Sequence, residues 1–118
     1  MADSGLFIGW GEVVRGRESE AVEVFNETMA YWSRLEDEGV IESAEPVFLE
    51  PHGGELQGFF FLRGDAERLS ALRVDDEFQK ILIRADLVID NLGVVGASMG
   101  PRLERLMETY TGQIAAFA

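Results

Sequence analysis

The sequence predicts an α+β domain in which the element order βαββαβ is followed by an additional helix. Four short segments rich in β-branched and aromatic residues are separated by longer segments whose apolar residues recur at steps of three and four. Only the Gly-rich turn over residues 51–54 separates the second and third short segments, so these two strands form a hairpin. With right-handed crossovers, this order places both main helices on one face of a four-stranded antiparallel sheet, with the first and third strands in the middle. A chain of 118 residues fits one such domain, over residues 1–118.

The third strand, within residues 54–65, contains three consecutive phenylalanines, Phe59, Phe60 and Phe61. Neighbouring side chains of a strand point to opposite faces of its sheet, so this strand needs apolar cover on both sides. The two helices cover one face only. The second face therefore needs a cover from elsewhere.

The first half of the chain supplies one central strand, one helix and one edge strand. Residues 6–14 form the first strand, and residues 18–38 form a long amphipathic helix that Gly39 ends. Residues 40–50 are extended, but Pro46 cannot donate to a sheet ladder. We therefore expect this second strand at an edge of the sheet.

The second half of the chain supplies the second helix, the last strand and a tail helix. Asp65 is a good helix cap, and Asp75 predicts a second cap that restarts or bends the same helix. Residues 92–99 are small and β-branched enough for the last strand, after which Pro101 begins a new helix. The apolar residues of this tail helix recur at helical spacing: Leu103, Leu106, Met107, Tyr110, Ile114 and Phe117. Such a helix must dock on another surface.

Composition excludes several classes of function. The net charge of -12 repels phosphate backbones and anionic lipid heads, so neither nucleic acid nor a membrane is an expected partner. Cysteine is absent and His52 is the only histidine, so thiolate and paired-histidine metal sites are excluded, and we expect neither a metal nor a cofactor. The first residues lack the basic flank and apolar core of a signal peptide, and we expect a cytoplasmic protein.

Three covers for the second sheet face correspond to three different functions. RNA-binding modules of this topology stack bases on exposed sheet aromatics, but the net charge of -12 disfavours RNA. The tail helix could fold back across the face. The third cover is the same face of a second subunit, which would close two sheets into a barrel. We expect this homodimer through the sheet face, with the tail helix packed around the barrel or across to the partner.

The layout resembles the dimeric α+β barrel superfamily of ferredoxin-like proteins, which includes antibiotic-biosynthesis monooxygenase-like, YCII-like, EthD-like and stress-responsive A/B-barrel proteins. The residues that carry this resemblance are the first strand with its turn Arg15-Gly16-Arg17, the segments Glu50-Pro51-His52-Gly53-Gly54 and Arg63-Gly64-Asp65, and Asp75-Asp76-Glu77-Phe78-Gln79 before Leu92-Gly93-Val94. The resemblance implies a ferredoxin-like fold that forms a dimeric α/β barrel. It names no activity, because this scaffold hosts enzymes, ligand binders and uncharacterised members.

Side chains that face the barrel interior are the candidate ligand-binding residues. If Phe60 and Leu62 face the helices, the alternate positions of the same strand face the interior. On the first strand we favour Ile8, Trp10 and Glu12 as interior, because Gly9 and Gly11 would let the helix approach closely. The candidate set is Trp10, Glu12, Gln57, Phe59, Phe61 and Arg63. This mostly apolar lining with a few polar groups is typical of a site for a small apolar or aromatic molecule.

Two alternatives stay open. The barrel could instead be filled, with Glu12 and Arg63 paired at its rim, which would leave a non-catalytic ligand-binding or structural homodimer. The resemblance also suggests a cofactor-independent enzyme of the monooxygenase, cyclase or isomerase type, because related monooxygenases use Trp, Asn, Tyr and Arg around a pocket. Trp10 and Arg63 match two of these types, but no matching Asn or Tyr is evident on the strands. Whether the protein is an enzyme is left open, and His52 beside Pro51 and Gly53 is interpreted as a turn residue.

Overall fold

A computed structural model describes residues 2–118 of the chain. The elements follow the predicted order, with the second predicted helix divided in two. They are β1 (Ser4–Trp10), α1 (Glu18–Asp37), β2 (Ser43–Phe48), β3 (Gly58–Gly64), α2 (Ala66–Arg73), α3 (Asp76–Asp86), β4 (Gly93–Ser98) and α4 (Gly100–Phe117). None of the helices in residues 2–118 is long and apolar enough to cross a membrane.

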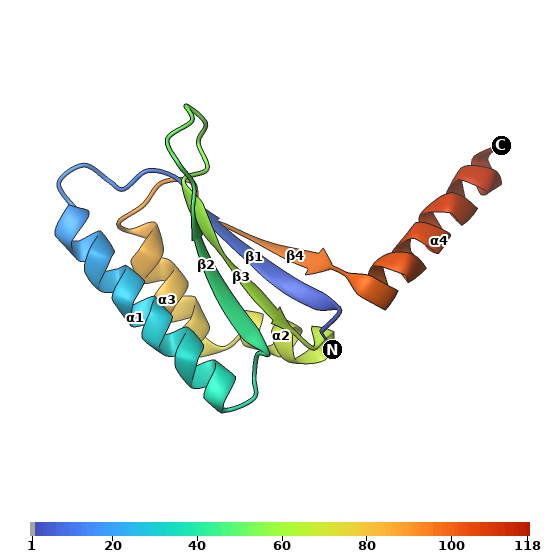
Figure 1. Ribbon diagram of the computed structural model, residues 1–118, viewed down its shortest axis with the longest axis horizontal. Coiled ribbons are helices and arrows are strands. Elements are labelled where there is room, and N and C mark those ends of the chain that lie inside the picture. The colour runs from blue at the N-terminus through green and yellow to red at the C-terminus, as the bar shows by residue number, and fades with distance from the viewer. Residues whose placement is uncertain (1) are drawn as a thin grey trace.

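The four strands form one antiparallel sheet in the order β2-β3-β1-β4. The helices α1, α2 and α3 lie on one face of this sheet, as Figure 1 shows. The ferredoxin-like βαββαβ arrangement with an additional C-terminal helix is therefore confirmed. Pro46 lies in the edge strand β2, where a missing N–H does not interrupt a central ladder.

Short-range chemistry sets the ends of the helices. The Asp65 carboxylate accepts a hydrogen bond from the N–H of Arg68 at 3.2 Å and caps α2. The Asp75 carboxylate accepts from Glu77 and Phe78 and starts α3, so the predicted second cap divides the helix. Gly39, just after α1, has a φ of 74°. A residue with a side chain adopts this left-handed conformation only with strain, which explains glycine at this position.

The hydrophobic core lies between the sheet and the helices. Strand residues Leu6 and Ile8 on β1 and Phe60 and Leu62 on β3 are buried there. The helices supply Tyr31, Trp32, Leu35, Leu69, Leu72 and Phe78 to the same cluster. Phe60 and Leu62 thus face the helices, as the sequence predicts.

The opposite face of the sheet, here called the open face, carries aromatic rings that lie low over glycines. Phe7 pairs with Phe61 across β1 and β3, and the rings of Phe7 and Phe59 have centroids 4.7 Å apart. A Cβ atom on Gly5 would lie 2.7 Å from the ring of Phe61, and one on Gly9 would lie 2.7 Å from the ring of Phe7. The glycines of β1 therefore make room for rings on the open face.

The side chains of β1 point to the opposite faces of the sheet from those expected, so this prediction is wrong. Ile8 is buried in the core, and Trp10 packs against that core on the helix side, while Phe7 lies on the open face. The prediction assumed that glycines admit a helix. In the structure the space beside Gly5 and Gly9 is taken by neighbouring rings, which reverses the orientation of the whole strand.

Helix α4 extends away from the rest of the chain on the side of the open face (Figure 1). None of its residues is buried. Because of this arm, the radius of gyration is 16.5 Å, compared with about 13.5 Å for a compact chain of this length.

Candidate functional site

An apolar cavity of about 310 Å³ lies between the sheet and the helices α1 and α3. It is on the helix side of the sheet and within a single protomer. Sixteen residues line it: Ile8, Trp10, Val13, Glu18, Ala21, Val22, Val24, Phe25, Thr28, Phe48, Phe60, Leu82, Ala85, Val88, Ile89 and Leu92. Its volume falls at the lower end of the roughly 300–1,000 Å³ of small-molecule sites.

Four aromatic rings from three strands and one helix form the aromatic wall of the cavity. Trp10 on β1 and Phe25 on α1 both contact Phe60, with ring centroids 4.9 Å and 5.4 Å from it. Phe48 on β2 stands edge-on to Trp10 at 5.8 Å. Such rings bind flat apolar molecules through stacked or edge-to-face contacts.

Besides the Trp10 indole, Thr28 and Glu18 are the polar side chains among the sixteen lining residues. The hydroxyl of Thr28 donates to the carbonyl oxygen of Val24 at 2.7 Å, which leaves its lone pairs free to accept a hydrogen bond from a ligand. Glu18 at the start of α1 accepts from the N–H of Gly16 at 3.1 Å. Hydrogen bonds from the backbone N–H groups of Glu18 itself and of Gly16 lower the pKa of the Glu18 carboxyl. The carboxylate therefore stays ionised beside the cavity and disfavours an anionic ligand.

Exposed apolar side chains surround the cavity. Val22 on α1 is 62% exposed and Phe48 on β2 is 68% exposed. Both belong to the lining, so apolar surface continues from the cavity to the outside. An apolar molecule meets matching surface along its whole path inward.

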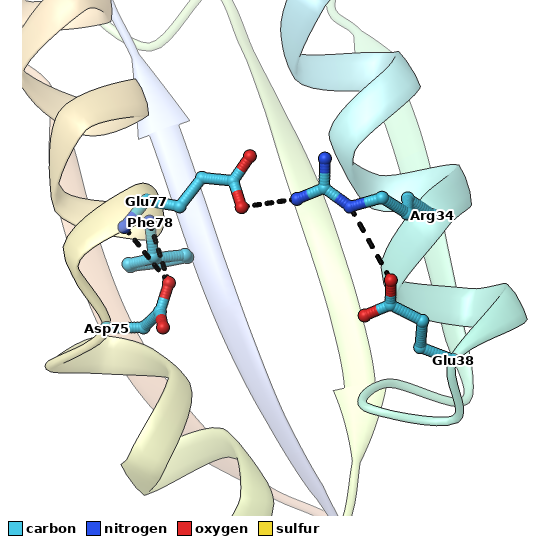
Figure 2. Close-up of polar contacts among 5 residues, drawn as sticks. All are labelled: Arg34, Glu38, Asp75, Glu77 and Phe78. Carbon is cyan, nitrogen blue, oxygen red and sulfur yellow. Dashed lines mark hydrogen bonds and ion pairs between the residues drawn. The ribbon is translucent and has the colours of Figure 1, made fainter.

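Ion pairs on the outer surface join the two helices that form the cavity wall. The Arg84 guanidinium on α3 makes a two-pronged contact with the Glu27 carboxylate on α1 at 2.9 Å and 3.0 Å. A second cluster of charges lies about two helical turns away: Figure 2 shows Arg34 between Glu77 and Glu38. The Glu77 carboxylate raises the pKa of Arg34. Exposed pairs like these are screened by solvent and contribute little to stability.

A second hollow, of about 400 Å³, lies beside this charged cluster and has both charged and apolar residues in its lining. It is lined by Tyr31, Arg34, Leu35, Glu38, Val40, Arg68, Ala71, Leu72, Asp75 and Glu77. Burial, and next the negative charges of Asp75 and Glu77, raise the pKa of Tyr31 to about 12. Asp75 caps α3, Arg34 pairs with Glu77, and Arg68 donates to the carbonyl of Gly39. Asp75, Arg34, Glu77 and Arg68 are thus all engaged in contacts within the chain.

The structure brings together only part of the predicted candidate set. Phe59, Phe61 and Arg63 share the open face, where the Arg63 guanidinium lies 4.8 Å from the centroid of the Phe61 ring. The side chain of Gln57 donates to the carbonyl of Gly54 at 2.9 Å and closes the loop between β2 and β3. Whether these four bind a ligand stays a prediction.

Trp10 and Glu12 depart from their expected positions. Trp10 lies on the helix side and lines the cavity described above. Glu12 is exposed beyond the end of β1, whereas Arg63 pairs with Gly5 near the start of that strand. The two charges therefore lie at opposite ends of β1, and the pairing of Glu12 with Arg63 that the filled-barrel alternative supposed does not form within one chain.

Sequence reasoning missed Phe25, Thr28 and Phe48 as cavity residues. Phe25 and Thr28 belong to the apolar stripe of α1, and this periodicity predicts a buried face without distinguishing a filled core from a cavity. Phe48 lies on β2, whose pairing puts Phe48 opposite Gly58. A signal was present there, because the small Gly58 leaves space that the Trp10 ring enters.

His52 holds a turn, as the sequence predicts. Its Nδ1 accepts from the N–H of Gly54 at 3.1 Å, so its Nε2 donates to the carbonyl of Leu56 at 2.7 Å. Within residues 2–118 there is no group of three or more His, Asp or Glu side chains that could hold a metal ion.

Solved structures of low sequence identity share this fold. A dimeric protein of unknown function and ferredoxin-like fold from Bacteroides fragilis matches with a TM-score of 0.60 and 12% identity, over 81% of this chain and 96% of that one. A conserved protein from Methanosarcina mazei matches with a TM-score of 0.61 and 14% identity, over 84% of this chain and 95% of that one. SnoaB, a cofactor-independent oxygenase from Streptomyces nogalater, matches with a TM-score of 0.54 and 14% identity, over 84% of this chain and 95% of that one. No protein-family model matches the chain, and no curated protein matches it.

These likenesses show the ferredoxin-like α+β fold, which the sequence predicted. The three neighbours are matched over almost their whole length, while 16–19% of this chain has no counterpart in them. Helix α4 has 18 of the 118 residues, which is close to the number of residues in this chain that the neighbours do not match.

Proposed function

We propose that this protein is a homodimer that binds a small apolar or aromatic molecule in the cavity between its sheet and the helices α1 and α3. The observation that carries the proposal is the cavity itself, with about 310 Å³ of space against the rings of Trp10, Phe25, Phe48 and Phe60. The hollow is open to the outside beside the exposed Val22 and Phe48, so a small molecule could enter it from solvent.

The lining defines the class of ligand. An uncharged aromatic molecule of up to three rings fits the aromatic wall, and a hydrogen-bond donor on it could bind the free lone pairs of Thr28. The ionised Glu18 carboxylate favours a neutral or cationic molecule over an anion. The proposed site therefore lies in each protomer and not in the lumen between two sheets.

The open face supports the dimer. Phe7, Phe59 and Phe61 form a low aromatic surface that no helix of residues 2–118 covers (Figure 1). Two such faces pack about 10 Å apart when sheets stack on each other. The neighbour from Bacteroides fragilis, which has the same fold, is described as dimeric.

A cofactor-independent oxygenase is the second candidate. It is favoured by Trp10 in the cavity and by the fold shared with SnoaB. The lining described above contains Trp10 but no Asn, Tyr or Arg side chain. Binding without chemistry is therefore the better supported function, and oxygen consumption in the presence of a bound polycyclic phenol would favour the second candidate.

Binding of the neutral fluorophore N-phenyl-1-naphthylamine tests the cavity. We expect saturable binding of one molecule per protomer, with a rise in its fluorescence. Ala21→Phe places a ring inside the cavity and should weaken binding by about tenfold or more, since the probe loses space against the aromatic wall. Ala85→Phe blocks the cavity from α3 and serves as a second variant.

The matched control is Ala30→Phe. Ala30 is on the same helix as Ala21 but is exposed and outside the cavity. This variant adds the same ring to the surface and should bind the probe as the unchanged protein does. Equal affinities of Ala21→Phe, Ala85→Phe and Ala30→Phe, with all three folded by circular dichroism, would mean that the probe binds elsewhere and would refute the proposed site.

A further inference from the structure

Helix α4 carries an apolar stripe that no element of residues 2–118 buries. The stripe residues are between 46% and 90% exposed: Leu103, Leu106, Met107, Tyr110, Ile114 and Phe117. Five of them follow steps of four, three, four and three residues, from Leu103 through Met107, Tyr110 and Ile114 to Phe117. This is the spacing of a seam that packs against another element.

The sequence of α4 does not support a helix that stands alone. Gly112 and the β-branched Thr109 and Thr111 lower helix propensity in its second half. In proteins, most of the stability of a helix comes from packing of its amphipathic face and not from propensity, and α4 has 18 residues that include these weak positions. Packing of the stripe must therefore supply stability that the helix itself lacks.

The attachment of α4 directs it away from its own sheet. A single residue, Met99, separates β4 from α4, and Gly100 has a φ of 53°. Near its base, α4 is tied to the chain by Arg105, whose guanidinium lies 3.7 Å from the Asp3 carboxylate. Beyond this point the helix extends on the open-face side (Figure 1).

We propose that α4 docks on a second copy of this chain, along the flank of the partner's body, while the two open faces pack against each other. This inference rests on the homodimer of the proposed function and adds the part that α4 plays in it. With 18 residues the helix is about 27 Å long. Stacked sheets lie about 10 Å apart, so a helix that projects on this side reaches past the partner's sheet and lies against its side.

Area and charge both fit a second copy. The six stripe residues expose roughly 100 Å² each, and together with the aromatic open face they approach the roughly 800 Å² per subunit of a standard interface. The chain carries a net charge of -12, but α4 carries Arg102 and Arg105 against Glu104 and Glu108, which cancel. The arm therefore approaches an acidic copy without adding repulsion.

Sedimentation equilibrium of charge variants tests this docking. The double variant Leu106→Glu with Tyr110→Glu places two charges in the stripe, and we expect its dimer dissociation constant to rise at least about 100-fold. The matched control, Thr109→Glu with Ala116→Glu, adds the same charge on the other side of α4 and should leave the dissociation constant within about threefold of the unchanged protein.

A crosslinking experiment identifies which chain α4 contacts. The sequence has no cysteine, so Gln113→Cys provides a single site for a benzophenone label next to the stripe. Labelled chains are mixed with unlabelled chains that carry a tag of different mass. We expect crosslinks between labelled and tagged chains, whereas crosslinks only within one chain would mean that α4 folds back, and would overturn the proposal.

The outcomes separate this inference from the proposed function. A dimer that the stripe charges do not weaken would overturn the docking of α4 and leave the sheet-face dimer standing. A monomeric unchanged protein would overturn both the dimer and the docking. Binding of N-phenyl-1-naphthylamine, measured on the same variants, reports separately on the cavity, which lies within one protomer.

Discussion

The two faces of the sheet carry similar side chains in different surroundings. On the helix side, Phe60 and Leu62 are almost completely buried, whereas the adjacent Phe59 and Phe61 on the open face are only partly covered. The helix side has a cavity between the sheet and its helices, whereas on the open face the rings of Phe61 and Phe7 lie close to Gly5 and Gly9. One strand thus contributes to the core of the chain on one side and to an aromatic surface without a helical cover on the other.

The largest difference in the free energy of unfolding should come from truncating neighbouring aromatic rings, one on each face of the sheet. Phe60→Ala removes a ring from the core and should lower the free energy of unfolding by about 3–5 kcal/mol. Phe61→Ala should cost the isolated protomer much less and should instead raise the dimer dissociation constant. Urea unfolding at two protein concentrations, together with sedimentation, distinguishes the two effects. Equal losses that do not depend on concentration would contradict the difference between the faces.

An intermediate loss of stability is expected from alanine substitutions at a cross-strand pair of glycines on the open face. Gly9 pairs with Gly93. A Cβ on Gly9 would lie 2.7 Å from the ring of Phe7 and 2.9 Å from Leu56, so Gly9→Ala should cost about 1–2 kcal/mol as these side chains shift. Gly93→Ala meets nothing within 4 Å and is the control, with an expected change of at most about 0.5 kcal/mol. Thermal unfolding of both variants measures the difference, and a similar loss in each would mean that the ring does not lie over Gly9.

The smallest effect at neutral pH is expected at Tyr31, on the covered side. Its hydroxyl is buried and has no hydrogen-bond partner among the described residues, so Tyr31→Phe should change stability little at pH 7. Its pKa of about 12 lies above the usual 10, so the unfolded chain loses this proton first. The contribution that this raised pKa makes to the free energy of unfolding is present below about pH 10 and is lost as the pH rises through 12.

Urea unfolding between pH 9 and 11.5 checks this sign. The free energy of unfolding should fall with pH in both proteins, because other groups titrate too, but it should fall less steeply in Tyr31→Phe. Parallel curves would show that the Tyr31 hydroxyl titrates alike in the folded and unfolded states.

The sequence predicted those parts of the fold that depend on local chemistry. Caps at Asp65 and Asp75, the left-handed Gly39 and the edge position of Pro46 each follow from one residue's own properties, and all four are confirmed. The order of elements fixed the topology, because few arrangements of right-handed crossovers exist.

The parts that were missed depend on space between elements. The side of the sheet to which each β1 side chain points depended on whether the space beside the glycines is filled by a helix or by an aromatic ring. Only the register of β1 with β3 decides between the two. The cavity arises from the distance between α1, α3 and the sheet, which the periodicity of a helix does not encode. Trp10 was therefore identified as a site residue but assigned to the wrong side.

The one-residue connection between β4 and α4 has a consequence for the time course of assembly. The strands and the helices α1, α2 and α3 contact one another within one chain, so they can fold at a rate that does not depend on concentration. In the proposed dimer, α4 acquires its contacts only after two chains meet, since Met99 leaves it little reach back to its own sheet. Refolding should then end in a bimolecular step whose half-time shortens as protein concentration rises.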